Sequence, residues 1–256
     1  MNSTDERLRL TAFEVLSFDC YGTLIDWESG ILRALDPLMS KASGRPSQEQ
    51  LLQSFAIHES EQQIQTPGMV YSELLAAVHK RLCRQWDIAA VEADHEAFGQ
   101  SIGQWPAFPD SVAALQYLKQ YYKLVILSNV DRPSFAYTNK SLEVEFDAIY
   151  IAEDIGSYKP DARNFEYLIT HLEDQGFGKE NLLHVAQSLF HDHVPAKAIG
   201  LRTAWIDRHQ GKPGAVIAAR ADVTYDFRFN SMADLVSAHQ DELRGRGHGR
   251  DAMPAP

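Results

Sequence analysis

The stretch FEVLSFDCYGTL, residues 13–24, decides the fold because an unbroken apolar run stops at Asp19 and a glycine-containing turn follows. We expect residues 13–18 to form a buried strand. Four more short apolar runs occur later in the chain, at 124–127, 148–152, 182–186 and 203–206. Continuous apolar strands separated by segments of helix length are typical of a parallel sheet with helices on both faces. The predicted fold class is therefore α/β.

The interval between the first two strands is longer than a crossover between parallel strands needs. It shows helical periodicity and no clear strand, with helices expected at 31–39, 48–65, 69–85 and 92–102. We interpret this interval as a helical cap inserted after the first strand. Two further helices are expected outside the cap, at 111–121 and 195–199.

These patterns divide the chain into three parts. An α/β core is expected from residues 1–26 and 106–238, and the all-helical cap from residues 27–105. The prolines in WPAFPD, residues 105–110, suit the hinge at which the chain re-enters the core. Residues 239–256 are expected to be a disordered tail, because their last stretch is rich in glycine, proline and charge and has no apolar face.

Composition excludes several classes of partner. The 256 residues include 35 acidic and 24 basic side chains, which gives a net charge of −11. A surface of this sign repels nucleic acid and anionic membranes, so neither is expected as a partner. No apolar run approaches the length of a membrane span or of a signal peptide, and two cysteines make no disulfide framework. We expect a cytoplasmic protein.

Polar residues follow the predicted strands at the edge where open α/β sheets bind ligands. They are Asp19, Ser128, Asn129, Lys159 and Asp192. An oriented carboxylate is a competent nucleophile, and an ammonium beside it would keep it ionised and attract a small anionic substrate. Each residue also has a plain structural interpretation, as a turn or helix cap or as a solvated loop residue.

The sequence His191–Asp192–His193 invites a metal site, but no matching cluster of cysteine or histidine accompanies it. A zinc site needs four ligands in tetrahedral arrangement, or three with an open position. We therefore expect no metal at this loop.

Taken in the order in which they occur along the chain, these polar residues and the segments around them resemble the four motifs of the haloacid dehalogenase superfamily of hydrolases. The matching segments are 19-DCYGTL-24, 127-LSN-129, Lys159–Pro160 and the Asp192 loop. The resemblance runs from about residue 13 to residue 235 and implies a Rossmann-like core with an inserted helical cap.

Within that superfamily the chain is similar to the type II 2-haloacid dehalogenases. Phosphatase members have an acidic residue where Tyr21 stands, and a magnesium-binding aspartate five residues before Asp192, where Gln187 stands. A dehalogenase needs neither group, because halide leaves without a proton. The resemblance thus implies no metal cofactor and hydrolysis of a small 2-haloacid to a 2-hydroxy acid. It also implies a possible homodimer.

The resemblance further implies a role for each site residue. Asp19 would attack the carbon that bears the halogen and form an aspartyl ester, which water then hydrolyses. The supporting residues would be Thr23, Ser128 and Asn129 to orient Asp19 and the substrate, Lys159 to supply positive charge, Asp192 to position Lys159 or water, and Cys20, Tyr21, Ser188 and His191 to bind substrate.

The leaving-group side departs from the dehalogenase pattern. Dehalogenases of this type carry a halide-binding arginine on a cap helix, and the corresponding segment 52–63 contains none. His58 or Gln62 are candidate replacements. Helical spacing does not determine which aromatic residues of the cap line the pocket and which are buried in the core, although we expect most to be buried. These residues are Phe55, Tyr71, Trp86, Phe98 and Trp105.

Three alternatives to dehalogenation therefore stay open. One is the same attack on carbon with another leaving group, as in the ring opening of azetidine-2-carboxylate, with His191, His58 or Tyr21 as the acid. Another is a phosphatase in which Asp19 and Asp192 hold Mg²⁺. The third is a catalytically idle member that serves as a binding protein.

Overall fold

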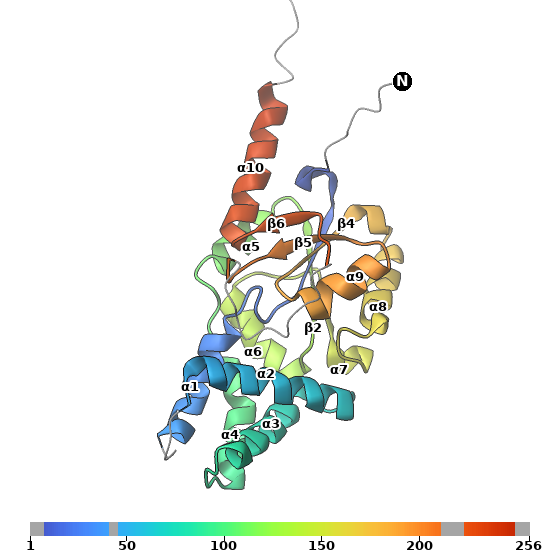
Figure 1. Ribbon diagram of the computed structural model, residues 1–256. Helices are drawn as coiled ribbons and strands as arrows, with labels where there is room; N and C mark the ends of the chain where they lie inside the picture. The colour runs from blue at the N-terminus through green and yellow to red at the C-terminus, as the bar shows by residue number, and fades with distance from the viewer. Residues whose placement is uncertain (1–7, 41–45, 211–222, 249–256) are drawn as a thin grey trace, which may run out of the picture.

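A six-stranded parallel sheet forms the centre of the computed structural model, which describes residues 8–40, 46–210 and 223–248 (Figure 1). The strand order is β3-β2-β1-β4-β5-β6, and every neighbouring pair is parallel. The strands are β1 (Val15–Phe18), β2 (Lys123–Ser128), β3 (Ala148–Ile151), β4 (Leu182–Ala186), β5 (Arg202–Ile206) and β6 (Phe227–Phe229). β1 lies in the middle of the sheet because it pairs with both β2 and β4.

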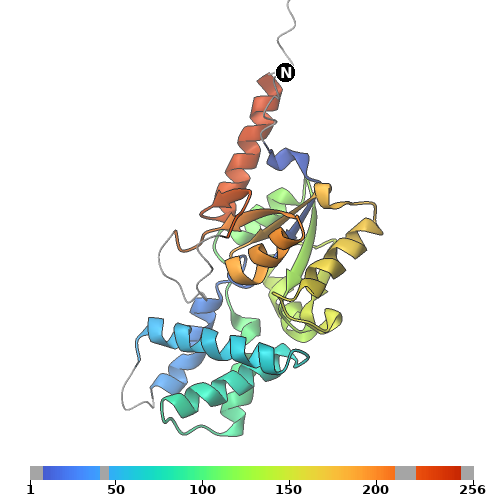
Figure 2. The same ribbon diagram turned by 45° about the vertical axis from the view of Figure 1, so that its right-hand side comes forward.

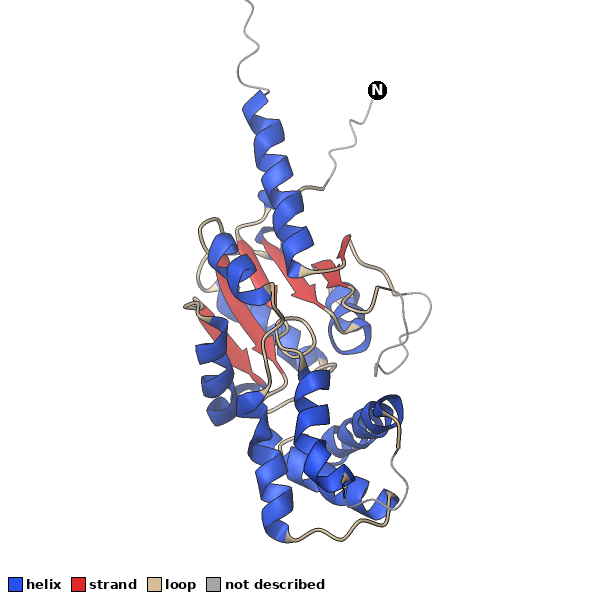
Figure 3. Cartoon of the chain, turned by 90° about the vertical axis from the view of Figure 1, so that its left-hand side faces the viewer, coloured by secondary structure: helices blue, strands red, loops and turns tan. Residues whose placement is uncertain are grey.

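Helices cover both faces of the sheet (Figure 3), which confirms the predicted α/β class. Alternate residues of β2 explain the two layers, since successive side chains of a strand point to opposite faces. Leu124 and Ile126 belong to the core with α5 (Ser111–Leu118), α6 (Arg132–Leu142) and α10 (Met232–His248). Val125 and Leu127 pack instead in the core with α8 (Ala162–Glu173) and α9 (Val194–Ala198).

The helices between β1 and α5 form a separate layer beyond the edge of the sheet (Figure 2). They are α1 (Trp27–Met39), α2 (Gln48–Gln65), α3 (Tyr71–Gln85), α4 (Glu92–Gly99) and η2 (Gln100–Gln104), and we call them the helical cap. Side-chain caps stabilise the first turns of two of these helices. Asp26 accepts a hydrogen bond from the Ser29 amide at the start of α1, and Ser47 and Gln50 form a capping box at α2.

Four short helices complete the described chain. They are η1 (Leu10–Ala12), α7 (Ala152–Ile155), η3 (Lys179–Asn181) and η4 (Leu189–His193), the last of which is a π-helix. Within the described residues, no helix combines the length and apolar character that crossing a membrane requires.

The prediction of a disordered tail at 239–256 is wrong for residues 239–248, because α10 continues to His248. Residues 249–256 lie outside the described residues. The helix persists because the His239 ring packs against a cluster of tyrosines, at Tyr117, Tyr121 and Tyr122. The Glu242 carboxylate then accepts hydrogen bonds from the amides of Leu10 and Thr11 and from the Thr11 hydroxyl, at 2.9–3.0 Å. Contacts to distant residues thus stabilise a helix that has no apolar stripe of its own there.

Replacing Glu242 with alanine is expected to lower the free energy of unfolding by about 1–3 kcal/mol, because three donors lose a charged acceptor. Urea denaturation measures this loss. Asp241→Ala is the matched control, since the pairing of its carboxylate in the part of the chain that the structure describes is with the exposed Arg244, one turn away. The control is expected to change the unfolding free energy by less than about 0.5 kcal/mol. Equal losses in the two variants would contradict the role given to Glu242.

Candidate active site

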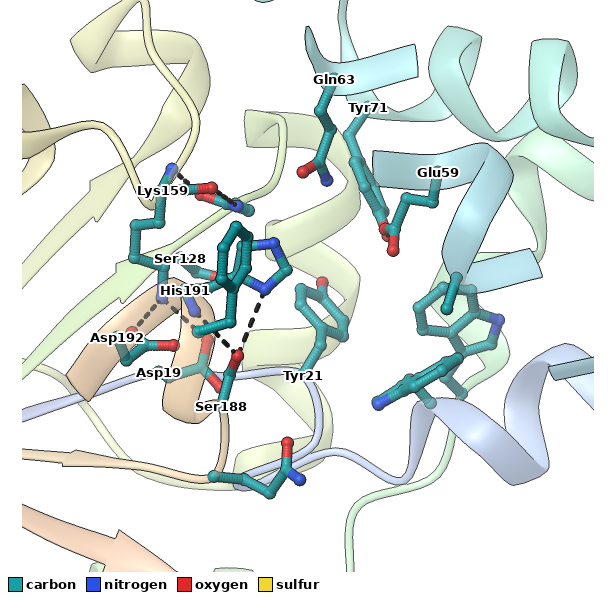
Figure 4. Close-up of a pocket in the computed structure, with 16 residues that line it drawn as sticks. Asp19, Tyr21, Glu59, Gln63, Tyr71, Ser128, Lys159, Ser188, His191 and Asp192 are labelled. Atoms are coloured by element: carbon teal, nitrogen blue, oxygen red, sulfur yellow. Dashed lines mark hydrogen bonds and ion pairs between the residues drawn. The ribbon is translucent and has the colours of Figure 1, made fainter. Parts of the chain in front are cut away.

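The polar residues singled out at the strand ends meet at one edge of the sheet and line one cavity (Figure 4). Asp19 follows β1, Ser128 ends β2 and Asp192 lies in η4 after β4. Lys159 comes from the loop between α7 and α8. Parallel strands place their carboxyl ends at the same edge, which is why residues far apart in sequence converge here.

The Asp19 carboxylate is held by a hydrogen bond on each oxygen. Thr23 Oγ1 donates to Asp19 Oδ2 at 2.7 Å, and Lys159 Nζ donates to Asp19 Oδ1 at 2.9 Å. The Thr23 hydroxyl also accepts a hydrogen bond from the Gln187 amide at 2.9 Å, which ties the β1 loop to the end of β4. Gly22 makes the turn possible, because its φ of +95° lies in the left-handed region that favours glycine.

Lys159 connects the other polar residues of the site, and its side chain is only 1% exposed. Its ammonium donates to Asp19, to Asp192 Oδ1 at 2.6 Å and to the Leu127 carbonyl at 2.8 Å. These three bonds use all three of its hydrogens. Asn129 holds the backbone on which Lys159 stands, because its amide group bonds to both Lys159 N and Lys159 O, at 2.7 and 2.9 Å. Asn129 therefore positions Lys159, although the resemblance implied a role in orienting Asp19 and the substrate.

A buried chain of hydrogen bonds links Asp192 to His184 and then to Ser17. His184 Nε2 lies 3.0 Å from Asp192 Oδ1, and His184 Nδ1 lies 2.8 Å from Ser17 Oγ. Donation from Nε2 to the carboxylate leaves Nδ1 to accept from Ser17. Sequence reasoning missed His184, because it stands inside an apolar strand and its pairing partner is apparent only once β1 and β4 are neighbours.

Burial and charge act together on the three ionisable groups. Burial raises the pKa of Asp19 above its ordinary value, while the Lys159 ammonium acts in the opposite direction. Burial alone would lower the pKa of Lys159, but the two carboxylates outweigh it and hold that pKa above its usual value. Burial would raise the pKa of Asp192, but Lys159 and His184 outweigh it and hold that pKa below its usual range. Lys159 and Asp192 therefore form an ion pair next to a buried, basic Asp19 carboxylate.

Ser128 and the β1 loop have distinct surroundings. Within the described residues, the buried Ser128 hydroxyl has no hydrogen-bond partner, and it borders the cavity. Tyr21 lines the cavity too, but its hydroxyl bonds to Thr138 Oγ1 at 2.9 Å, and burial raises its pKa well above 10. The Cys20 side chain belongs to the hydrophobic core, and burial raises the pKa of its thiol. The role expected for the Cys20 and Tyr21 backbone amides stays a prediction.

The two histidines beside Asp192 point to different places. His191 lines the cavity with Ser188, and His191 Nδ1 lies 3.2 Å from Ser188 Oγ. His193 Nε2 lies 3.0 Å from the Ala186 carbonyl, in the core. Burial lowers the pKa of each imidazole to about 4, so both are neutral at pH 7.

Another group of ligand-type side chains lies in the helical cap. His79, Cys83 and His95 place one ligand atom each within 4.8 Å of one another, and all three are buried. His79 Nδ1 and His95 Nδ1 are 2.7 Å apart, which is a hydrogen-bond distance and links α3 to α4.

Comparison with known proteins assigns the family. Residues 13–188 match the model of the haloacid dehalogenase-like hydrolases. The chain belongs to this family. It is 26% identical over 132 residues to the (S)-2-haloacid dehalogenase of Pseudomonas putida, and 27% identical over 132 residues to that of Pseudomonas fluorescens. Each match covers 50% of this chain and 56% of the relative, so the chain spans about half the length of these curated relatives.

Solved structures of dehalogenases share the fold of most of this chain. The L-2-haloacid dehalogenase of Xanthobacter autotrophicus, with chloropropionic acid covalently bound, superimposes with a TM-score of 0.72 at 19% identity. The superposition covers 91% of this chain and 99% of that structure. This coverage is larger than the segment that the family model matches, residues 13–188.

In this haloacid dehalogenase-like hydrolase the cap supplies the wall of the cavity that faces Asp19 (Figure 4). The cavity has a volume of about 100 Å³, which holds several water molecules or a small acid. Its cap residues are Trp27, Ala56, Glu59, Gln63, Tyr71 and Trp105. Of the cap aromatics considered from sequence, Phe55 and Phe98 are buried in the core as expected for most, whereas Tyr71 and Trp105 also border the cavity.

The residues proposed to replace the halide-binding arginine do not line this cavity. His58 Nε2 lies 2.8 Å from Gln85 Oε1, and Gln62 Nε2 donates to Thr66 Oγ1 at 2.9 Å. Glu59 and Gln63 face the cavity instead, together with Ala56. The three recur every three or four residues on α2 and so share one face of it. That spacing was visible in the sequence, but the direction of the face was not.

Proposed function

We propose that this chain hydrolyses a small 2-substituted carboxylate through a covalent ester on Asp19, and that 2-haloacids are its first substrates to test. One observation carries the proposal: a buried carboxylate borders the cavity while Thr23 and Lys159 hold its two oxygens. A desolvated, oriented carboxylate is a competent nucleophile toward carbon. The (S)-2-haloacid dehalogenases among its relatives support the choice of substrate.

In the first step an Asp19 oxygen bonds to C2 of the substrate, and the bond from C2 to the halogen breaks with its electron pair. Lys159 keeps Asp19 ionised before the attack, and its positive charge balances the negative charge of Asp192 in both steps. Because Lys159 already donates three hydrogen bonds, we assign binding of the substrate carboxylate to the Ser128 hydroxyl instead. This revises the expectation that Lys159 attracts the substrate directly.

In the second step water attacks the Asp19 carboxyl carbon and releases the 2-hydroxy acid. Asp192 Oδ2 makes no hydrogen bond within the described residues, and Asp192 borders the cavity. We assign it to orient this water. One proton is released as water adds to the ester, and the Asp19 carboxylate is restored.

The magnesium-dependent alternative fits the donor set poorly. Mg²⁺ takes oxygen ligands in octahedral geometry. Here Asp19 Oδ1 and Asp192 Oδ1 both bond to the Lys159 ammonium, and the neutral Gln187 stands where phosphatases supply a third carboxylate. We therefore propose a reaction that proceeds without a metal cofactor.

A single turnover in oxygen-18 water tests the covalent step. The protein, in excess over 2-chloropropionate and in the presence of EDTA, is expected to release chloride and to gain one heavy oxygen in the peptide that contains Asp19. Peptide mass spectrometry measures the label. Heavy oxygen in the product alone would rule out the ester. Phosphate release from a phosphomonoester only with Mg²⁺ would favour the phosphatase, and no turnover of any kind would favour the binding protein.

A further inference from the structure

The wall of the cavity opposite Asp19 receives the leaving group, because displacement at carbon expels that group on the side away from the attacking oxygen. Figure 4 shows Asp19, Lys159 and Asp192 on one side of this space and Glu59 on the other, beside Tyr71. Segment 52–63 of α2 contains no arginine, and this helix presents the Glu59 carboxyl group to the cavity. The leaving-group side therefore carries an acid and no arginine cation from α2.

The surroundings of Glu59 favour the protonated acid. It is partly buried, its cavity neighbours on the cap include Trp27 and Ala56, and it forms no ion pair within the described residues. Its one hydrogen bond there comes from the Tyr71 hydroxyl, which donates to Glu59 Oε1. The second carboxyl oxygen is left to carry a proton. Burial raises the pKa of Glu59 to about 7, which is the range in which a general acid works best at neutral pH.

The other titratable groups around the cavity are poor proton donors at neutral pH. Tyr71 and Tyr21 have pKa values raised well above 10 by burial. Burial also raises the pKa of Tyr158, which packs against Tyr71 outside the cavity lining and donates to the Met69 carbonyl. His191 is neutral at pH 7, because burial lowers its pKa to about 4. Lys159 has all three hydrogens in use. Asp19 is the proposed nucleophile, and Lys159 and His184 hold the pKa of Asp192 below its usual range. Among the described lining residues, Glu59 therefore remains as the proton donor.

On α2 itself, two polar neighbours of Glu59 bond to residues of α3. His58 bonds to Gln85, and Glu61 pairs with Arg81 at 3.0 Å. Neither lines the cavity, so the groups that face Glu59 there are the tyrosines, His191 and the ion-paired cluster around Lys159.

We propose that Glu59 donates a proton to the leaving atom, and that the site accepts substrates whose leaving atom is an oxygen, such as a small 2,3-epoxy carboxylate. The inference rests on the proposed Asp19 ester. Bromide and chloride leave as stable anions and gain little from an acid, whereas an alkoxide leaves only as it takes a proton. An epoxy acid of three carbons also suits a cavity of about 100 Å³.

The steps balance. An Asp19 oxygen bonds to C2, the bond from C2 to the ring oxygen breaks, and its electron pair takes the proton from Glu59 to form a hydroxyl group. Glu59 is left as a carboxylate. Water then adds to the Asp19 ester, the dihydroxy acid departs, and the proton released from that water restores Glu59.

The test compares Glu59→Gln with the unaltered protein on oxirane-2-carboxylate and on 2-bromopropionate. Glutamine keeps the size of the side chain and removes the acid. For the epoxide, kcat/KM is expected to fall by about 10²- to 10⁴-fold, while bromide release changes by less than about fivefold. The unaltered protein is expected to open the epoxide more slowly as pH rises through about 7, and the variant to lose that dependence. Gln63→Ala, on the same wall, is the matched control and is expected to affect both substrates alike.

Three results would overturn the inference. Equal losses on the two substrates would give Glu59 a purely structural role through Tyr71. A rate that rises with pH through about 7 would mean that Glu59 acts as a carboxylate, which would suit a cationic leaving nitrogen. No epoxide opening in a protein that gains heavy oxygen on Asp19 from 2-bromopropionate would refute the inference and leave the proposed function standing. Without that label, the proposed function itself fails.

Discussion

Replacing Asp19 with asparagine is expected to lower kcat/KM for 2-chloropropionate by at least about 10⁴-fold, the order of loss seen when an enzyme loses its nucleophile. The amide has no negative charge with which to attack carbon, and its single oxygen can keep one of the two hydrogen bonds that Asp19 accepts, from Lys159 or from Thr23. The fold is expected to persist, because Lys159 keeps its bond to Asp192. Halide release measures the activity, and urea denaturation verifies the fold.

Asp161→Asn is the matched control for Asp19→Asn. Asp161 is an exposed aspartate two residues after Lys159 that caps α8 through the Arg163 amide, and asparagine caps a helix equally well. Halide release by this control is expected to stay within about twofold of the unaltered protein. An Asp19→Asn variant that retained a tenth of the activity and still folded would remove Asp19 from the mechanism.

The reactive side of the site was predictable from sequence because topology alone assembles it. Asp19, Ser128 and Asp192 each follow an apolar strand, and parallel strands end at a common edge. The deciding information is therefore local: where each strand stops and which residue comes next. The register of β1 between β2 and β4 then brings these residues together without any further specification.

The cap side was not predictable in the same way. α2 has apolar residues on one side, such as Phe55, but also buries Gln62 and Gln63, so its periodicity does not reveal which polar face meets the cavity. That direction depends on how the cap packs over the core. Glu59 was overlooked for this reason, and His58 was considered in its place.

Several elements of the core were not predicted, and for two of them the reason is that distant contacts stabilise them. β6 has only three residues, Phe227–Phe229, and pairs at the edge with β5. α10 depends on His239 and Glu242, whose partners lie more than a hundred residues away in sequence. Neither element has a local apolar pattern strong enough to indicate it.

Replacing Lys159 with methionine is expected to abolish halide release and to lower the free energy of unfolding by about 3–5 kcal/mol, because the buried Asp19 and Asp192 carboxylates lose their shared cation. Methionine matches the length of lysine, so the loss reports charge more than volume. Urea denaturation of the two proteins at pH 7.5 measures it. The double variant Lys159→Met/Asp192→Asn is the control, since it also removes one of the stranded carboxylates. It is expected to be more stable than the single variant.

The pH dependence distinguishes a charge effect from lost packing. In the unaltered protein Lys159 and His184 hold the pKa of Asp192 low, so its stabilising contribution is present above pH 4 and is lost as pH falls below that. Without the ammonium, burial and mutual repulsion raise the carboxylate pKa values of Asp19 and Asp192 in the folded state. The single variant is therefore expected to lose stability as pH rises from 4 toward 7, and to recover part of the deficit at pH 5. A deficit that is the same at pH 5 and pH 7.5 would show that Lys159 contributes packing alone, and Asp19 would then need another source of its charge.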